Sequence, residues 1–266
     1  MAVLGFDQWQ MVTPGALREP GPEDVLDAVE SVPAGDVLVV AGGAEALRAA
    51  RIAVFTLRRP GVAVIDLSGP PTRRLTLAYA LQHLPPEAYG YADAVVATVQ
   101  LVCRTHALLS SVSRLAEPRP SLTDHVAGWF PGQFFAVDVE GGTVRRMRHP
   151  HLTPSAGPFA VTASGWRHAI QPTVTPLPAT TSEAVGPAGS GHWQAQQWWE
   201  VTVAQVPIAD AVRHALATAR PRRCPSCTRP VTGQRCRFCA VLVPGPPGPV
   251  SSPPGAAAPD LEESYA

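Results

Sequence analysis

The clearest hydrophobic pattern in the chain is a pair of continuous apolar runs, each followed by a segment of helical periodicity. DVLVVAGG (36–43) and GVAVIDLSG (61–69) have the length and composition of buried strands. After the first run, a helical face ends at Pro60 and consists of Leu47, Ala50, Val54 and Leu57. PPTRRLTLAYALQHL follows the second run and ends before Pro85 and Pro86. This strand–helix–strand–helix order predicts an α/β fold, with Rossmann-like alternation and a parallel sheet covered on both faces.

A third helix is predicted after Asp93. The segment AVVATVQLVCRTHALLSSVSRL is long enough for about six turns, and Pro118 and Pro120 end it. Cys103 lies within this segment. We interpret Cys103 as a small buried apolar residue rather than a reactive thiol, because no motif cysteine or obvious base is near it in the sequence.

From residue 129 onward, short alternating strands with glycine turns replace the helical pattern. FFAVDV, EGG and TVRRMR predict one hairpin, and PFAVTA, SG and WRHAI predict another. Residues 171–192 are rich in Pro, Thr, Gly and Ser and predict a long loop or linker. A strand then carries Trp198 and Trp199 on opposite faces, and PIADAVRHALATAR predicts a short helix.

Composition narrows the classes of function. All 21 residues counted as Lys+Arg are arginine, and asparagine is absent. Without lysine, a Schiff-base enzyme, a Walker-type phosphate loop and a protein kinase are excluded, because each needs an amine that arginine cannot replace. The codon bias behind this composition indicates a bacterial source of high GC content. Net charge is zero, so no global field draws the protein to nucleic acid or membrane.

The beginning of the chain has no basic leader, and no apolar run approaches the roughly 20 residues of a membrane-spanning helix. We therefore expect a cytoplasmic protein without a membrane span. In that compartment cysteines stay reduced, so paired cysteines are expected to bind a metal rather than each other.

Two Cys-x-x-Cys pairs stand eight residues apart in CPSCTRPVTGQRCRFC. The four cysteines are Cys224, Cys227, Cys236 and Cys239. Each pair lets one tight turn direct two sulfurs at a common point, and together the pairs complete the tetrahedron that zinc accepts. Four thiolates leave no open position, so the spacing predicts a structural Zn²⁺, with an iron centre, a redox dithiol or free thiols as alternatives.

This stretch resembles the short zinc ribbons appended to many bacterial proteins, with CPSC and CRFC as the two knuckles. The resemblance covers residues 224–239 and implies a small β-hairpin module that holds proteins or nucleic acids rather than a catalytic site. Such knuckles usually continue with glycine, whereas this chain has Thr228 and Ala240 there. The loss of glycine at a left-handed turn is expected to distort the knuckle or weaken the site.

Basic residues surround the ribbon without any acidic residue between positions 211 and 243. A local positive excess of this kind attracts phosphates or an acidic partner surface. Beside Arg213, the expected partner-binding residues are Arg220, Arg222, Arg223, Arg229, Arg235 and Arg237.

A second candidate site comes from topology, because ligands of parallel α/β sheets bind at the carboxyl ends of the strands. There, hydroxyls, free helix N–H groups and arginines are expected to hold an anion. The candidate residues are Gly42, Gly43, Asp66, Ser68, Thr72, Arg73 and Arg74.

These features predict six segments and one leading function. The segments are an α/β domain (1–120), a β-hairpin-rich extension (121–170), a linker (171–192), a strand and helix (193–220), a zinc ribbon (221–243) and a disordered Pro-rich tail (244–266). We expect an accessory or adaptor protein whose ribbon docks a protein partner. Because the sequence contains no catalytic motif, we expect a protein that is not an enzyme. The alternatives are an enzyme or sensor that binds a phosphorylated or nucleotide-like molecule of unknown identity at the strand ends, or nucleic-acid binding through the arginine-rich ribbon.

Overall fold

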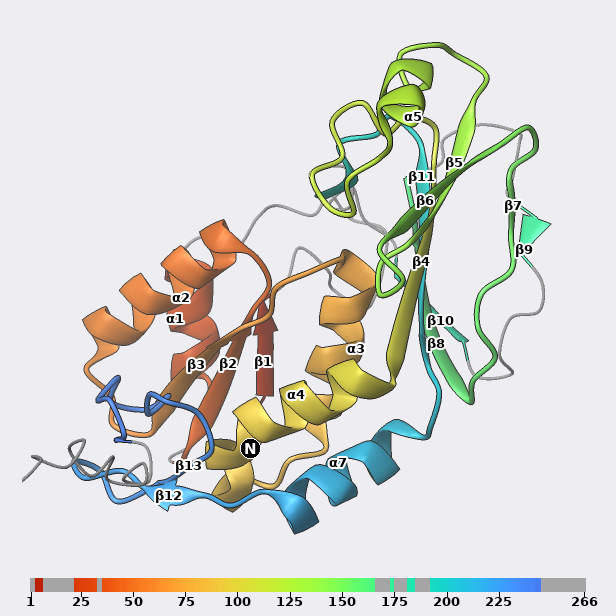
Figure 1. Cartoon of the computed structure of the whole chain (residues 1–266). Coiled ribbons are helices and arrows are strands. Elements are labelled where there is room, and N and C mark those ends of the chain that lie inside the picture. The colour runs from red at the N-terminus through yellow and green to blue at the C-terminus, as the bar shows by residue number, and fades with distance from the viewer. Residues whose placement is uncertain are drawn as a thin grey trace, which may run out of the picture.

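The computed structural model describes residues 3–6, 22–32, 35–165, 173–174, 181–184 and 192–244. Within these residues the chain forms a small parallel sheet covered by helices and a larger, mostly antiparallel sheet beside it (Figure 1). The small sheet has the order β1-β2-β3, and its strands are β1 (Val3–Phe6), β2 (Val37–Ala41) and β3 (Val62–Asp66). Both neighbouring pairs are parallel, so the predicted α/β class is confirmed.

Helices cover both faces of the small sheet because its central strand is apolar on both sides. Val37 and Val39 of β2 pack with α1 (Pro22–Glu30) and α2 (Ala44–Leu57). The alternate residues Leu38 and Val40 pack with α3 (Pro71–Gln82) and α4 (Ala92–Val102), on the opposite face. A 3₁₀ helix, η1 (Pro86–Tyr91), joins α3 to α4. The continuous apolar run seen in the sequence therefore has the expected cause, burial on both faces.

The larger sheet has the strand order β10-β8-β11-β4-β5-β6, antiparallel except between β10 and β8. Its strands are β4 (Cys103–Leu109), β5 (Phe134–Asp138), β6 (Thr143–Met147), β8 (Phe159–Ser164), β10 (Thr181–Ala184) and β11 (Trp198–Ala204). The other elements are α5 (Leu122–Ala127), the parallel pair β7 (His151–Leu152) and β9 (Thr173–Val174), α7 (Ile208–Thr218), and the antiparallel pair β12 (Arg222–Arg223) and β13 (Pro230–Val231).

The prediction of one long helix after Asp93 is wrong in its second half. The helix α4 ends at Val102, and the chain continues directly as β4, which pairs with β11 over all seven of its residues. Cys103, Thr105 and Ala107 are buried whereas the residues between them are partly exposed. This alternation is the period of a strand, and pairing on both sides outweighs the local helical tendency. The burial predicted for Cys103 is confirmed.

Other predictions for the second half are confirmed in part. The hairpin of β5 and β6 forms as expected. The strand β8 also forms, but it pairs with β11 and β10, and the partner predicted for it at 166–170 lies outside the described residues. The predicted linker contains β9 and β10, and the tail beyond 244 lies outside the described residues. Trp198 is buried and Trp199 is partly exposed, in separate apolar clusters as expected for opposite strand faces.

A single apolar cluster connects the two sheets. It contains Leu38 and Ile65 of the small sheet, Val99 of α4, and Phe135 and Trp198 of the larger sheet. Because α4 runs into β4 without a loop, the two sheets share one core. The chain passes from the helices that cover the small sheet to the larger sheet at the end of α4.

Candidate functional sites

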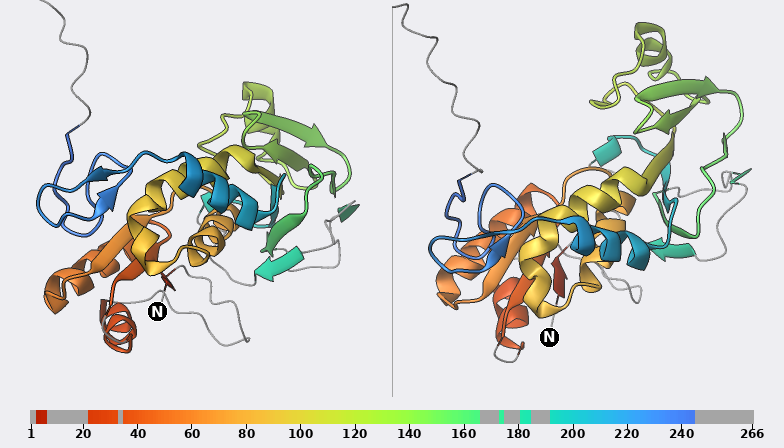
Figure 2. Two further views of the ribbon diagram at one scale, coloured as in Figure 1. Left: turned by 90° about the horizontal axis from the view of Figure 1, so that it is seen from below. Right: turned by 60° about the horizontal axis from the view of Figure 1, so that its bottom comes forward.

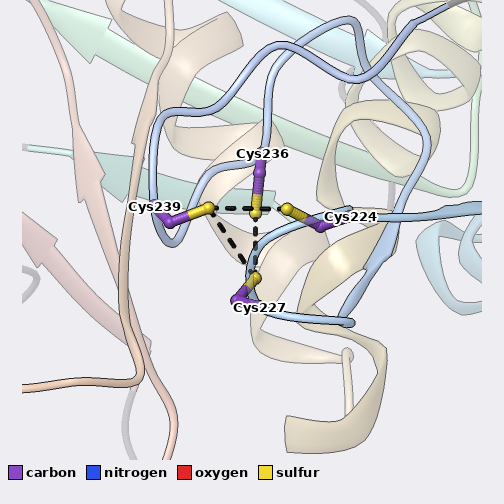
Figure 3. Close-up of side chains that lie close together, drawn as sticks. All are labelled: Cys224, Cys227, Cys236 and Cys239. Atoms are coloured by element: carbon purple, nitrogen blue, oxygen red, sulfur yellow. Dashed lines mark hydrogen bonds between the residues drawn. The ribbon is translucent and has the colours of Figure 1, made fainter.

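The four cysteine sulfurs lie close enough together to hold one metal ion. The Sγ atoms of Cys224 and Cys239 are 3.5 Å apart, those of Cys227 and Cys236 are 3.5 Å apart, and those of Cys227 and Cys239 are 3.8 Å apart (Figure 3). A tetrahedral ion with metal–sulfur bonds of about 2.3 Å requires sulfur–sulfur separations of about 3.8 Å. The residues present therefore fit a tetrathiolate centre, and no other cluster of potential metal ligands occurs among the described residues.

The two Cys-x-x-Cys knuckles have the same backbone geometry. In each, the residue directly after the second cysteine has a left-handed conformation. The N–H of Thr228 donates to the carbonyl of Cys224 at 3.0 Å, and the N–H of Ala240 donates to the carbonyl of Cys236 at 2.9 Å. Thr228 has φ 61° and Ala240 has φ 59°. The chain thus makes the left-handed turns that glycine would make easily, and it makes them at a conformational cost.

The thiols of the cluster differ in their surroundings. Hydrogen bonding by the backbone N–H of Cys227 is the main reason that the pKa of Cys224 falls to about 6. Burial raises the pKa of Cys236 to about 12, and burial also raises the pKa of Cys239. A bound cation would hold all four as thiolates, because metal binding displaces thiol protons.

Ala240→Gly is expected to stabilise the ribbon by about 0.5–1 kcal/mol, because glycine removes the left-handed strain and only part of that gain is lost to extra freedom in the unfolded chain. Thermal and denaturant unfolding measured with bound metal would test this. Ala219→Gly is the matched control. Ala219 has φ −63°, where alanine is not strained, so glycine there should destabilise the protein. Equal loss of stability in both variants would contradict the strain argument.

The ribbon (residues 221–243) packs against the small sheet of its own chain, as Figure 2 shows from two sides. The Arg229 guanidinium donates from Nε and Nη2 to the two carboxylate oxygens of Asp36, at 3.0 and 2.7 Å. Arg237 pairs in the same way with Asp93 at the start of α4, with an Nη2–Oδ1 distance of 2.6 Å. Two-point pairs of this kind fix orientation as well as charge.

Backbone contacts complete the docking of the ribbon. The N–H of Thr232 donates to the carbonyl of Gly90 at 3.3 Å, and the Thr232 hydroxyl accepts from the N–H of Ala94 at 3.2 Å. The N–H of Val64, on the free edge of β3, donates to the carbonyl of Arg237 at 3.4 Å. Phe238 contributes to both the main core and the ribbon core. The ribbon is therefore an integral part of the α/β unit.

Most of the six arginines predicted to contact a partner are engaged inside the chain. Besides Arg229 and Arg237, Arg222 donates to the carbonyls of Val243, Pro244 and Gly233. Arg235 donates to the carbonyl of Ala240 at 2.7 Å, and Arg223 donates to that of Thr228 at 3.3 Å. Arg220 is exposed. Two of these arginines are thus paired with acidic residues that are distant in sequence, and three donate to carbonyls within or next to the ribbon.

A buried polar cluster lies where the N-terminus of α3 meets the larger sheet. Glu200 of β11 is 0% exposed, and its Oε1 accepts from the N–H of Thr72 at 2.6 Å and from the Thr72 hydroxyl. Its Oε2 accepts from Nε1 of Trp193 at 2.5 Å. Burial raises the pKa of Glu200, whereas the hydrogen bonds from Thr72 and Trp193 and the charge of Arg74 oppose that rise.

Threonine hydroxyls and a second ion pair extend this cluster. The hydroxyls of Thr72 and Thr202 are 2.7 Å apart, and those of Thr202 and Thr105 are 2.9 Å apart. Arg73 forms an ion pair with Glu140, whose other oxygen accepts from the N–H of Thr105 at 2.7 Å. Two strands, the turn after β5 and one helix are therefore joined by polar groups in the interior.

The structure brings together only some of the residues predicted at the strand ends. Thr72 and Arg73 belong to the buried cluster, and a Cβ atom at Gly43 would lie 3.1 Å from Nη1 of Arg74. Asp66 and Ser68 are exposed, and Gly42 is partly exposed. The sequence interpretation missed Glu200. The single charge in the mostly apolar strand WWEVTVA was the signal that could have identified it, because a buried carboxylate needs hydrogen-bond donors from elsewhere in the chain.

A pocket of about 550 Å³ opens where β4 ends and β11 begins, near α5. Its wall carries hydroxyl and amide groups from the loop after β4 and from the residues before β11, together with Arg114 and the aromatic residues Trp129 and Phe130. The Ser111 hydroxyl donates to the carbonyl of Gly128 at 2.6 Å, which ties the two sides of the pocket together.

The aromatic rim of this pocket continues into an exposed apolar face. Leu122, Val126, Trp129 and Phe130 are 86%, 47%, 66% and 61% exposed. They recur at the spacing of one helical face along and just beyond α5. Exposed apolar groups gathered at a pocket mark a binding surface more often than single exposed residues do. In the described part of the chain, no helix is long and apolar enough to cross a membrane.

No protein-family model matches the sequence, and no curated protein does. Among solved structures, the chain is similar to a DegV family protein from Eubacterium eligens loaded with heptadecanoic acid, at 13% identity and a TM-score of 0.44, covering 70% of this chain and 78% of that one. It is also similar to the Fatty Acid Kinase (Fak) B3 protein of Streptococcus pneumoniae loaded with linoleic acid, at 16% identity and a TM-score of 0.44, covering 70% and 76%. A fatty-acid-binding DegV family protein from Thermus thermophilus has 13% identity and a TM-score of 0.41, with 70% and 77% covered.

The predicted adaptor function is wrong, as are a docked protein partner, a nucleotide-like ligand at the strand ends and nucleic-acid binding through the ribbon. The structures similar to this chain are described as fatty-acid-loaded or fatty-acid-binding proteins. Within the chain, Arg229 and Arg237 are paired with its own carboxylates, and the N–H of Thr72 is already bonded to Glu200. The groups expected to meet partners instead stabilise the fold.

Proposed function

We propose that this protein binds an amphipathic carboxylate of the fatty-acid class in the pocket beside α5. The observation that supports this most directly is the combination of one arginine, several hydroxyl and amide groups, and two exposed aromatic rings around a single cavity. Its volume of about 550 Å³ lies within the range of small-molecule sites. Fatty acids are the simplest molecules that offer both an anionic headgroup and an apolar chain.

Each part of the ligand has complementary groups in the pocket. Arg114 supplies a guanidinium, which binds carboxylates at two points. Among the described residues no carboxylate forms an ion pair with Arg114, so its charge is available to a ligand. Trp129 and Phe130 lie at the cavity and also continue the exposed face of α5. An acyl chain that leaves the cavity along these rings would cover apolar surface that otherwise faces water.

Arg114→Gln is expected to weaken binding of decanoate by about 10-fold to 100-fold, the loss typical of a hydrogen bond to a charged group. Binding of decanol should change little, because the alcohol has no charge for Arg114 to compensate. Isothermal titration calorimetry of delipidated protein with both ligands would measure the difference.

Arg119→Gln is the matched control, since Arg119 is an exposed arginine nearby that does not line the pocket. Trp129→Ser should weaken both ligands, whereas Phe55→Ser, which removes an even more exposed ring on α2, should weaken neither. If wild type bound decanoate and decanol equally and Arg114→Gln changed neither, the proposed function would be rejected.

We also propose that the four cysteines hold a structural Zn²⁺, as the resemblance to bacterial zinc ribbons implies. The sulfur–sulfur distances support this, and so does the complete set of four thiols, which leaves no position for a substrate. Cys224, Cys227, Cys236 and Cys239 would hold the ion, whose contribution is to fix the fold of the ribbon and thereby the pairs made by Arg229 and Arg237. Free, metal-binding thiols are consistent with a cytoplasmic location.

A further inference from the structure

Glu200 is placed where an external anion would normally bind. The first free N–H groups of a helix attract anions, and α3 begins at Pro71 without a capping side chain, because its N-cap residue is Pro70. The carboxylate that fills this position comes from a strand 128 residues further along the chain, through the 2.6 Å bond from the N–H of Thr72 to Glu200 Oε1.

The surroundings of Glu200 offer hydrogen-bond donors to both oxygens of its carboxylate. Its two oxygens have separate donors: the N–H and hydroxyl of Thr72 for Oε1, and Nε1 of Trp193 for Oε2. The Thr72 hydroxyl is in turn linked to Thr202, and Arg74 contributes positive charge. Donors from α3 and from the segment before β11 thus converge on one planar anion that is completely shielded from water.

We propose that Glu200 is an intramolecular ligand: its carboxylate occupies the anion site at the N-terminus of α3, closes the strand ends of the small sheet to external anions, and clamps α3 to the larger sheet. This role rests on Thr72 and Trp193, neither of which lines the pocket proposed for the fatty acid, although Trp193 precedes the pocket residue Gln194 in the chain. The residues expected to bind an external anion, Thr72 and Arg73, are satisfied by carboxylates of the chain itself.

Truncation of Glu200 should therefore convert the closed site into a receptor for a small carboxylate. Glu200→Ala removes the two carbons and two oxygens beyond Cβ, which together have the size and charge of acetate. The variant is expected to melt well below wild type, because the donors of Thr72 and Trp193 lose their acceptor. Acetate should restore most of the melting temperature in a saturable manner, with half of the effect at about 1–10 mM, an affinity within reach of a ligand of four non-hydrogen atoms.

Three controls separate a specific anion site from general effects. Acetamide has the shape of acetate without its charge, and sodium chloride matches the ionic strength, so neither should restore Glu200→Ala. Acetate should leave wild type unchanged, since Glu200 fills the site, and should leave Glu200→Gln unchanged, since the glutamine side chain fills the space. Arg114→Gln, which alters the pocket and none of the groups around Glu200, should melt as wild type does with or without acetate, which keeps this test distinct from the test of Arg114.

The proposal is overturned if Glu200→Ala is as stable as wild type, or if acetate and acetamide stabilise it equally. Should Glu200→Ala fail to fold, a double-mutant cycle of Thr72→Val and Glu200→Gln decides the matter. The two changes are expected to be strongly non-additive in melting temperature, because they break the same contact. Additive effects would show that Thr72 and Glu200 act independently and would refute the intramolecular ligand.

Discussion

Cys224→Ser is expected to abolish metal binding and to release the ribbon from the small sheet. The cluster then has three thiolates, and serine does not replace a thiolate as a zinc ligand at neutral pH. In small zinc modules the free energy of metal binding is largely the free energy of folding, about 10–16 kcal/mol in isolated peptides. Zinc content measured on purified protein should fall from one ion per chain to near zero, and the ribbon should become sensitive to protease.

The rest of the chain should fold but with reduced stability, because Arg229 and Arg237 lose the framework that directs them to Asp36 and Asp93. Chelation of the metal from wild type should reproduce this state. Cys103→Ala is the matched control, since Cys103 is a buried thiol outside the cluster. Its substitution should lower stability and leave zinc content unchanged. Full zinc content in Cys224→Ser, or iron in place of zinc in wild type, would contradict the proposed centre.

Gly90→Ala should weaken the packing of the ribbon against the rest of the chain and leave metal binding unchanged. A Cβ atom at Gly90 would lie 1.9 Å from the carbonyl oxygen of Pro230 and 2.8 Å from its carbonyl carbon. Both atoms are backbone, so a side-chain rotation cannot relieve the overlap and the ribbon must move away from η1. We expect a loss of about 2–3 kcal/mol in the free energy of unfolding, the upper part of the range for overpacking.

Zinc content in Gly90→Ala should remain at the wild-type level, because no cysteine is displaced. Hydrogen exchange should instead accelerate at the N–H of Val64, which loses its acceptor on Arg237. Glu87→Ala, an exposed substitution on the same 3₁₀ helix, serves as control and should change neither measurement. Protection of Val64 equal to wild type would show that the ribbon is not held at this position.

The parts of the fold that sequence predicts well are those determined by local patterns. Continuous apolar runs identify β2 and β3, and cysteine spacing identifies a cluster whose members lie within 4.8 Å of one another. Even the departure from the knuckle pattern is informative, because Thr228 and Ala240 have the positive φ values that glycine usually provides.

The remaining features depend on contacts between distant segments. The residues CRTHALL follow a helix and look helical by composition, yet they form a central strand because β5 and β11 pair with both of their edges. Glu200 and Thr72 are 128 residues apart, and Arg229 and Asp36 are 193 residues apart. No local pattern predicts such pairs. The arginines of the ribbon were therefore interpreted as a surface for a partner, whereas Arg229 and Arg237 pair with carboxylates of the same chain.

The bond between Val64 and Arg237 has a further consequence for the behaviour of the metal-free protein. In the order β1-β2-β3, β3 is an edge strand. The ribbon lies against its outer edge, where the N–H of Val64 donates to the carbonyl of Arg237. Uncovered strand edges pair readily with other chains. If the proposed metal centre holds the ribbon in place, loss of the metal would do more than loosen a terminal module: it would expose this edge of β3 to pairing with other chains.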